Sequence, residues 1–378
     1  MLCGMKNLQK HKEDAMIRRM KWLVVALGMM LLVACTKEST ATDTLDLSKI
    51  TVEELEKKAK EEGQVHSVGM PDAWANWKET WADIEKTYGI SHTDTDMSSA
   101  EELAKFAAEK TNASADIGDV GIAFGPVAEE QGLSLKYKTS YWDDIPDWAK
   151  DDDGDWLLAY TGQMCFITDK QNLPEGVEPP KTFDDILNGN FVLTIGDMET
   201  ANQSQFALLN AAVTYGGDEK NLEPGLDFFK KLAEQGRLKT TDASLANLET
   251  GEVQVGMLWD FNALNYADAV DRDRFVITVP PVTVMTGYTT IINRYAANPY
   301  AAALAREFIL SDEGQDNLAK GYARPIRENA KISDEAKKKL LPPSAYKDIY
   351  KVKDSKAWEE STKQLAQLWQ ENVMAYMK

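Results

Sequence analysis

The sequence predicts an α/β fold of two lobes, in which helices flank open and mainly parallel sheets. Short apolar runs of strand length alternate with amphipathic helical stretches, the rhythm that produces parallel sheets. This alternation occurs once before and once after the apolar run 156–168, which suits a strand crossing between lobes. With 378 residues, 43% of them hydrophobic, the chain is long enough for two such cores. Two α/β lobes therefore fit the pattern better than one large sheet.

Residues 1–35 predict an export signal. Basic residues at 18, 19 and 21 precede the apolar run 22–34, whose 13 residues fall short of the roughly 20 that a membrane-spanning helix needs. The run ends in Leu32-Val33-Ala34-Cys35, which resembles a bacterial lipobox, so we expect Cys35 to be lipidated and to begin the mature chain. An ordinary signal peptide with an incidental cysteine and a buried core helix are the alternatives. We expect an exported protein, lipid-anchored to the outer face of the cytoplasmic membrane, at the cell surface or in the periplasm.

The domain boundaries follow from composition. Residues 36–47 contain no aromatic side chain and little that could be buried, so they predict a flexible tether. The first lobe is expected to comprise residues 48–161 and 285–378, including the C-terminal helices, and the second lobe residues 162–284. The start of translation, Met1 or Met16, stays open.

The elements of the first lobe follow in order along the chain. Thr51 and Glu54 form a capping box that opens a helix, which Gly63 ends. The pattern then predicts a strand over 65–69, a helix over 71–88, a strand over 90–96, a helix that begins at Ser98 or Ser99, and a strand over 115–122.

The second lobe repeats the rhythm after the crossover strand 156–168. A capping box at Thr182 and Asp185 opens a helix. It is followed by a strand over 191–195, helices over 205–215 and 226–235, and strands over 252–259, 275–279 and 288–292. From Pro299 onward the chain is mostly helical.

Composition excludes several classes of function. With 42 basic and 61 acidic residues and a formal net charge of -19, the chain lacks the basic excess of nucleic-acid-binding proteins. Three cysteines rule out a disulfide framework, and three histidines without an HxxxH pair do not favour a histidine metal centre. The acidic run 143–155 lacks the glycine and glutamate of a calcium-binding loop, so it predicts a solvated connection. No metal and no cofactor are expected.

Seven motifs, in this order and spacing, carry a family resemblance. They are the lipobox, Gly69–Trp74, Ala115–Gly121, Tyr160–Gln163, Thr182–Leu187, Val255–Asp260, and Gly321–Arg327 after Phe308–Ser311. Together they resemble the extracellular solute-binding proteins of ABC importers, in the cluster of ferric-ion, polyamine, thiamine and sugar-phosphate receptors. The resemblance covers most of the mature chain. It implies a type II periplasmic-binding-protein fold, with crossover strands between the lobes, a ligand cleft that closes by a hinge, a membrane permease as partner, and a monomer.

Ligands of open α/β sheets lie beyond the carboxyl ends of strands, where helix N-termini add free N–H groups. Polar and aromatic residues at such places are the predicted ligand contacts. They are Asp72, Trp74, Ser98, Ser99, Asp119, Tyr160, Thr200, Asn202, Ser204, Trp259, Asp260 and Tyr288. The pair Trp259-Asp260 is the best candidate, because it ends an otherwise apolar strand.

Purely structural roles remain open for several of these residues. Asp72, Ser98 and Ser99 also suit helix caps, and the glycines beside Asp119 also suit a tight turn. Trp74 also suits packing on one buried helix face with the tryptophans at 77 and 81.

Three ligand classes are weighed. Aromatic rings and carboxylates favour a cation that resembles a polyamine or thiamine, although Tyr288-Thr289-Thr290 lacks the aromatic–x–Asp expected of polyamine receptors. A sugar phosphate or phosphonate would use serine and threonine hydroxyls and two helix N-termini, with Arg324 as the nearest arginine. Ferric ion or a ferric complex is least favoured, because tandem tyrosines are absent.

An enzyme is not expected, because no GxSxG, HExxH or Walker A pattern appears. A secreted hydrolase and a surface adhesin are the further alternatives, and the chain contains no repeat of the length that adhesins would use.

Overall fold

The computed structural model describes residues 45–378, which form one compact body from Asp46 to the C-terminus. The predicted export signal, the lipidation site Cys35 and most of the tether 36–47 lie outside the described residues. No helix within the described part of the chain combines the length and apolar character of a membrane span.

Within residues 45–378, one mixed sheet of 11 strands runs through the body in the order β2-β1-β3-β9-β4-β7-β5-β6, with β10 and β8 paired to β4 and β11 paired to β9. The strand bounds are β1 (Gln64–Val68), β2 (Ser91–Thr95), β3 (Ile117–Gly121), β4 (Trp156–Asp169), β5 (Leu193–Thr194), β6 (Leu238–Lys239), β7 (Val255–Trp259), β8 (Phe275–Thr278), β9 (Val282–Ile292), β10 (Arg324–Pro325) and β11 (Asp348–Tyr350).

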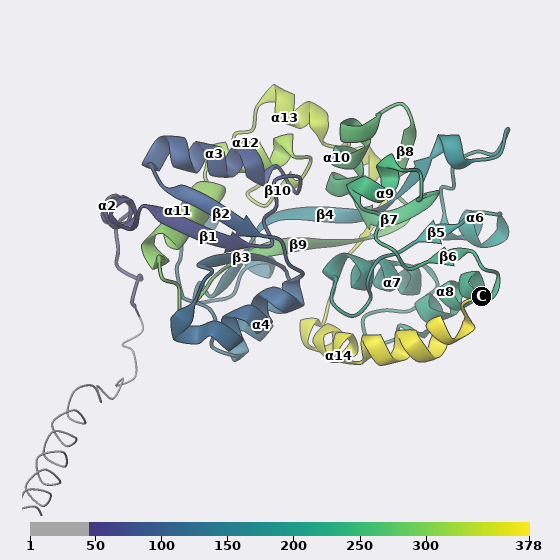
Figure 1. Ribbon diagram of the computed structural model, residues 1–378, viewed down its shortest axis with the longest axis horizontal. Coiled ribbons are helices and arrows are strands. Elements are labelled where there is room, and N and C mark those ends of the chain that lie inside the picture. Colours follow the sequence, from purple (N-terminus) through teal and green to yellow (C-terminus); the bar gives the residue numbers. More distant parts are fainter. Residues whose placement is uncertain (1–44) are drawn as a thin grey trace, which may run out of the picture. The chain divides into compact units, whose positions relative to one another are not determined.

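Two long central strands join the ends of the sheet (Figure 1). Residues 156–163 of β4 pair antiparallel with β9, and residues 164–168 of the same strand pair antiparallel with β7. All 14 residues of β4 are buried. On one side lie the parallel strands β2, β1 and β3, and on the other the parallel strands β6, β5 and β7. We call these two strand sets, with the helices packed on them, the first half and the second half.

Each half has its own set of helices, which lie on both sides of its strands (Figure 1). Those of the first half are α2 (Val52–Glu62), α3 (Trp77–Tyr88), α4 (Ser99–Glu109), α5 (Phe124–Glu130), α11 (Pro299–Ile309), α12 (Asp312–Lys320) and α13 (Asp334–Lys339). Those of the second half are α6 (Phe183–Asn188), α7 (Asn202–Thr214), α8 (Glu223–Glu234), α9 (Leu245–Glu249), α10 (Asp260–Val270) and α14 (Ser355–Asn372).

The predicted starts of α2 and α6 are confirmed, and local hydrogen bonds determine both. Both capping boxes are present, at the start of α2 and at the start of α6. The helix predicted over 71–88 begins only at Trp77, because Ala75 and Asn76 adopt left-handed backbone conformations with φ of 48° and 61°. The backbone of these two residues lies against Gly321, where a side chain would overlap it. Residues 71–76 are therefore a loop that is available to the cleft.

The C-terminal helix α14 packs on the second half, as the yellow helix of Figure 1 shows. The ring of Trp358 lies 5.0 Å from that of Phe206 on α7, and the ring of Trp369 lies 5.3 Å from that of Phe229 on α8. The sequence interpretation placed residues 285–378 in the first lobe, whereas α14 packs on the second half because its two tryptophans contact α7 and α8. The lobe boundaries themselves fall inside β4 and β9 and stay a prediction.

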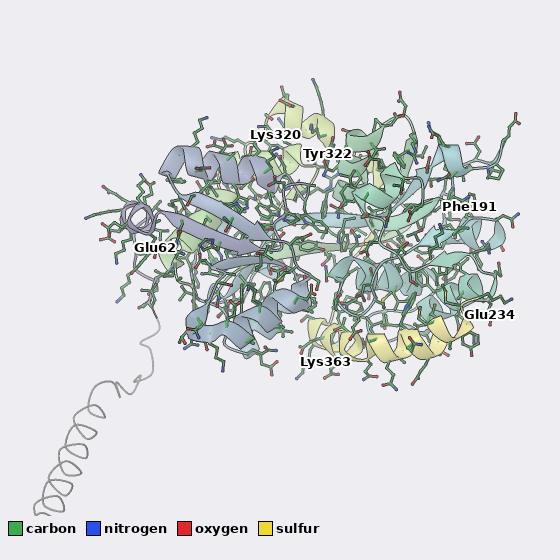
Figure 2. The ribbon with its side chains drawn as sticks, in the orientation of Figure 1. Glu62, Phe191, Glu234, Lys320, Tyr322 and Lys363 are labelled. Carbon is green, nitrogen blue, oxygen red and sulfur yellow. The ribbon has the colours of Figure 1, made fainter. Side chains whose placement is uncertain are left out.

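Hydrogen bonds also connect the halves outside the sheet. The Asn265 side chain of α10 donates to the carbonyl of Ala73 in the loop before α3. Tyr322, which follows α12 and is labelled in Figure 2, donates its hydroxyl to Asp268 of α10. Both contacts join α10 of the second half to segments of the first half.

Candidate functional site

A cavity of about 400 Å³ lies between the halves, at the carboxyl ends of β1, β2 and β3. The first half contributes the loops after β1 and β2 together with side chains of α4 and β3. The second half contributes the start of α7, the segment 242–246 and a side chain of α10. The lining residues are Gly69, Pro71, Ala73, Trp74, Asp96, Met97, Ser98, Ser99, Glu102, Asp119, Ala201, Asn202, Gln203, Asp242, Ala243, Ser244, Leu245, Ala246, Tyr266 and Tyr288.

A hydrogen-bonded relay runs along one wall of the cavity. Trp74 Nε1 donates to the Tyr160 hydroxyl at 2.6 Å, and that hydroxyl donates to Asp119 Oδ2 at 2.6 Å. Tyr160 is itself buried beneath the wall, with its ring stacked 5.6 Å from that of Tyr288. Tyr160 thus positions Trp74 and Asp119 without reaching the cavity.

Asp119 lies at the base of the cavity and is 2% exposed. Burial raises the pKa of its carboxyl well above the ordinary value, and the Tyr160 hydrogen bond only partly opposes this. Its second oxygen, Oδ1, is buried and has no hydrogen-bond partner. A carboxyl in this state is available to a group that enters the cavity.

Glu102, one turn into α4, lies beside Asp119 and is 1% exposed. Its Oε2 accepts the backbone N–H of Asp119 at 3.1 Å. The carboxyl occupies a hollow that exists because residues 69 and 118 are glycines, since a Cβ atom at either would overlap it. Burial first, and then the negative charge of Asp119, raise the pKa of Glu102 well above the ordinary value.

Asn202 is the first residue of α7 and faces the cavity from the second half. The residue is 3% exposed and its amide lies beside the Tyr288 hydroxyl, but neither Nδ2 nor Oδ1 makes a hydrogen bond of good geometry. Buried amides are normally paired, so this one is available to a group that enters the cavity. The neighbouring Gln203 differs, because its Oε1 accepts from the Trp259 backbone and from Asn262, both at 3.1 Å.

Six of the twelve predicted contacts line the cavity together: Trp74, Ser98, Ser99, Asp119, Asn202 and Tyr288. The backbone N–H and the hydroxyl of Ser98 both donate to Glu101 Oε2 at the start of α4, at 2.9 Å and 2.7 Å. The hydroxyl of Ser99 accepts the backbone N–H of Gly121 at 3.0 Å. Both serines therefore already have local partners.

The other six predicted residues lie away from the lining: Asp72, Tyr160, Thr200, Ser204, Trp259 and Asp260. Trp259 is fully buried, and its Nε1 donates to the Tyr288 hydroxyl at 3.0 Å. Asp260 accepts the Gln163 backbone N–H at 3.0 Å and the Tyr346 hydroxyl at 2.5 Å. The pair that the sequence favoured most thus ends its strand in contact with internal polar partners. Asp72 is exposed, and Thr200 donates its hydroxyl to Asp197 at 3.1 Å.

Four charged or aromatic lining residues were not predicted from the sequence: Asp96, Glu102, Asp242 and Tyr266. Asp96 follows β2 directly, so the rule that selected Ser98 could have selected it too. The glycines at 69 and 118 on neighbouring strands were the signal for space beside Glu102. Asp242 and Tyr266 had no such signal, because Asp242 lies in the loop before α9 and Tyr266 lies in α10, a helix that the sequence pattern did not predict.

The cavity is acidic and aromatic. It contains the carboxyl groups of Asp96, Glu102, Asp119 and Asp242 and the rings of Trp74, Tyr266 and Tyr288, while no Lys, Arg or His occurs among the described residues that line it. Arg324, the arginine considered for an anionic ligand, donates to the carbonyl of Leu341 and lies 4.7 Å from the ring centre of Tyr346. The walls therefore offer carboxylates and π faces, which suit a cationic group.

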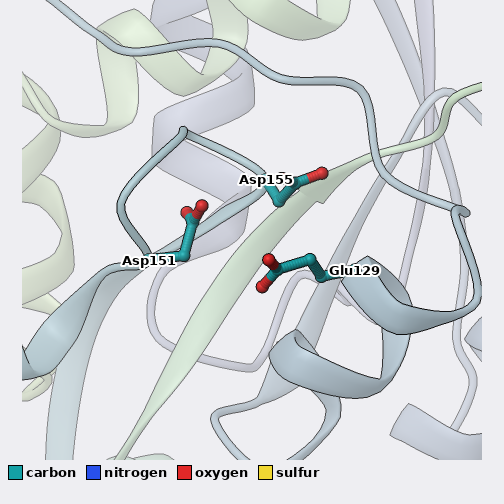
Figure 3. A group of neighbouring side chains, drawn as sticks. All are labelled: Glu129, Asp151 and Asp155. Atoms are coloured by element: carbon teal, nitrogen blue, oxygen red, sulfur yellow. The ribbon is translucent and has the colours of Figure 1, made fainter.

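A second carboxyl group cluster lies away from the cavity. Glu129, Asp151 and Asp155 bring one oxygen each within 4.8 Å of one another (Figure 3). Asp151 is occupied by the backbone N–H groups of residues 153, 154 and 156, and Glu129 accepts from Trp156 Nε1. Asp155 accepts from Ser134 and lies 3.5 Å from Lys136 Nζ. These internal partners give the cluster a structural role in its loop.

Two half-sheets joined by long strands around a polar cavity are the architecture of a solute receptor. The family model for bacterial extracellular solute-binding proteins matches residues 112–351, more than half of the chain, and the chain belongs to that family. The family resemblance read from the sequence is thus confirmed.

Solved structures with similar folds belong to the same cluster. The periplasmic binding protein AfuA from Actinobacillus pleuropneumoniae, with fructose-6-phosphate bound, is 21% identical with a TM-score of 0.68, over 82% of this chain and 98% of that one. The ferric binding protein from Campylobacter jejuni is 18% identical with a TM-score of 0.61, over 82% and 98%. The spermidine/putrescine receptor PotD from Streptococcus pneumoniae is 15% identical with a TM-score of 0.61, over 83% and 99%. Identities this low establish the fold, and no curated protein sequence matches the chain.

Proposed function

We propose that this protein is the receptor subunit of an ABC importer and that it captures a small organic cation, of the polyamine or thiamine kind, for delivery to a membrane permease. One observation carries the choice of ligand class. Four carboxyl groups and three aromatic rings line the cavity, and no basic side chain occurs among its described lining residues. A cation entering it exchanges water for carboxylates and ring faces, which are the groups that stabilise buried positive charge.

Sugar phosphates and phosphonates are the second candidate ligands, favoured by the N-termini of α4 and α7 at the cavity. Against them, the first turn of α4 already contains Glu101 and Glu102, which oppose an anion there. Ferric complexes remain the least favoured, and a hydrolase or an adhesin would need a different site.

The proposal includes the exported and anchored state. Lipid attachment at Cys35 would hold a monomeric receptor at the outer face of the cytoplasmic membrane, next to its permease. Metabolic labelling with a fatty acid should tag the wild-type protein and not Cys35→Ser, and an untagged wild type would remove the anchor from the proposal.

Calorimetry with purified protein tests the ligand class. Spermidine, putrescine and thiamine are compared with fructose 6-phosphate, a phosphonate and ferric citrate. We expect one cation to bind per chain and to be recovered unchanged, whereas a turnover product would support the hydrolase. Thermal shift screening gives a parallel readout, because a ligand of the folded state raises the melting temperature.

Removing one negative charge from the lining changes the affinity for a cationic and for an anionic ligand in opposite directions, so it distinguishes the two. Asp242→Asn removes a negative charge from the lining, so it should weaken a cationic ligand and strengthen an anionic one. Asp72→Asn removes the same charge from an exposed position outside the lining and serves as the matched control. Binding of only the phosphate compounds, strengthened by Asp242→Asn, would overturn the cation proposal.

A further inference from the structure

We infer that Glu102 is the carboxyl group that senses cations in the cleft, and that it releases a proton to solvent when a cationic group enters. The inference rests on the proposal above that the solute is a cation, and it names Glu102 as the residue that selects for positive charge. It follows that the affinity for the solute depends on pH.

Two buried carboxyl groups, those of Glu102 and Asp119, line the base of the cavity, and no basic side chain occurs among the described residues that line it. Glu102 Oε2 is 3.1 Å from the backbone nitrogen of Asp119, and both side chains are almost fully buried at the base of the cavity. The hollow around Glu102 is open only because residues 69 and 118 lack a Cβ atom. The site therefore has space prepared for a carboxyl group in an otherwise tightly packed wall.

Every neighbouring element presents acidic or neutral groups to this pair. Strand β2 and its following loop present Asp94 and Asp96, and Asp94 is held by the Ser67 hydroxyl and the Met70 backbone. Strands β4 and β9 present the phenols of Tyr160 and Tyr288. The second half presents Asp242 and Tyr266. The two histidines of β1 and β2 have other partners, because His66 bonds the Thr93 hydroxyl and His92 bonds Ser67 and stacks on Trp81.

Two adjacent carboxylates in a buried pocket without a counter-ion are strongly destabilised by lost hydration and by mutual repulsion. Both effects raise the pKa of Glu102, so the empty cleft keeps this carboxyl protonated. With Glu102 protonated, the pair carries one negative charge less and can hydrogen-bond neutral groups. An ammonium or thiazolium group supplies the missing counter-ion and favours the ionised form.

Unpaired polar atoms at the same cavity point independently to a ligand. Both side-chain amide atoms of Asn202 are buried without partners, and so is Asp119 Oδ1. Asn202 and Asp119 line the same cavity as Glu102, from opposite halves. Occupation of the cavity would satisfy all three atoms.

The step balances without any other reactant. The protonated Glu102 carboxyl and a free ammonium become a carboxylate paired with the bound ammonium, and one proton leaves for the buffer. By linkage, the cation lowers the pKa of Glu102 as much as ionised Glu102 raises the affinity for the cation. Affinity should therefore rise by up to roughly tenfold per pH unit until the carboxyl of the empty protein ionises.

The test counts protons during binding. Spermidine and thiamine are titrated into wild-type protein at one pH in two buffers with different ionisation enthalpies. We expect about one proton released per bound cation, with affinity rising as pH rises. In Glu102→Gln, which keeps the shape of the neutral acid, the proton release and the pH dependence should be lost. Glu109→Gln, on the exposed face of the same helix and paired with Lys105, is the matched control and should keep both.

A second measurement does not depend on any ligand or on binding by the variant. Infrared difference spectra between ligand-free wild type and Glu102→Gln at neutral pH should contain the carbonyl band of a protonated carboxylic acid. Cation binding without proton release, or spectra without that band, would overturn the inference and leave the proposed function intact. Absence of cation binding at every pH would instead overturn the proposed function itself.

Discussion

Gly121 at the end of β3 faces Asn202 at the start of α7, and a Cβ atom on Gly121 would overlap the Asn202 side chain. The two residues lie 81 positions apart in the chain and belong to opposite halves. Their close approach therefore depends on how the two halves are placed relative to each other, and we expect hinge opening to separate them.

The first prediction is that Gly121→Ala opposes closure. Overpacking at such a contact costs about 1–3 kcal/mol, and because only the closed form contains the contact, solute affinity should fall accordingly. Calorimetry measures the affinity, and X-ray scattering should detect less compaction on adding solute. Combining Gly121→Ala with Asn202→Ala removes the overlap and should restore the compaction. If Gly121→Ala compacts as fully as wild type when solute is added, closure does not press residue 121 against Asn202, and the prediction is wrong.

The second prediction concerns the unpaired amide. Asn202→Ala should weaken solute binding by about 1 kcal/mol or more, and it should leave thermal stability almost unchanged, because no internal hydrogen bond is lost. Asn210, further along the same helix, is the control. Its amide bonds the Val282 carbonyl and the Val284 N–H, so Asn210→Ala should lower stability and spare the binding step. A stability loss in Asn202→Ala matching that of Asn210→Ala would contradict this assignment.

The third prediction concerns Asp260, which lies outside the lining and accepts the Tyr346 hydroxyl. Burial raises the pKa of Asp260, and the Tyr346 hydrogen bond opposes that rise. Tyr346→Phe leaves a buried carboxyl oxygen without its donor, so the free energy of unfolding should fall by about 1–3 kcal/mol. Urea unfolding measures this loss. Solute affinity of the folded fraction should change far less, and a large affinity loss at unchanged stability would return Asp260 to the binding site.

The fourth prediction is acid sensitivity through His92. The ring stacks 3.8 Å from Trp81 and bonds the Ser67 hydroxyl, and burial lowers its pKa from 6.5 to about 4. The folded protein binds fewer protons here than the unfolded chain, so the stability contribution is present above pH 6.5 and is lost as pH falls toward about 4. Denaturant unfolding across this range should give a shallower acid slope for His92→Gln. An unchanged slope would assign acid sensitivity to other groups.

The fifth prediction is a loss of stability as pH rises, through Glu102, whereas the His92 effect is a loss as pH falls. Because the pKa of Glu102 is raised in the folded protein, its stability contribution is present below about pH 4.5 and is lost as pH rises through the folded value. Without solute, wild-type protein should therefore lose stability toward alkaline pH, and Glu102→Gln should flatten that slope. Spermidine should reduce the wild-type slope, since it stabilises the ionised carboxyl. Equal slopes in wild type and variant would mean that Glu102 is already ionised in the empty protein.

The sequence by itself determined the fold class, the alternation of strands and helices in both halves, the caps at Thr51 and Thr182, and the family. These depend on periodicity and on hydrogen bonds between residues three or four positions apart, which are legible in one stretch of chain. The rule that ligands lie beyond strand ends also selected Trp74, Asp119 and Asn202 for the cavity.

Only the tertiary structure decided which polar residues share that cavity. Trp259 and Asp260 end a strand just as the rule requires, but internal partners bind them. In the sequence, nothing distinguishes Glu102 from other acidic residues in the first turn of a helix. Only the pairing of β1 with β3 places Gly69 and Gly118 against its carboxyl group. Side-chain direction and burial depend on packing between segments far apart in the chain, and a local pattern contains no record of that packing.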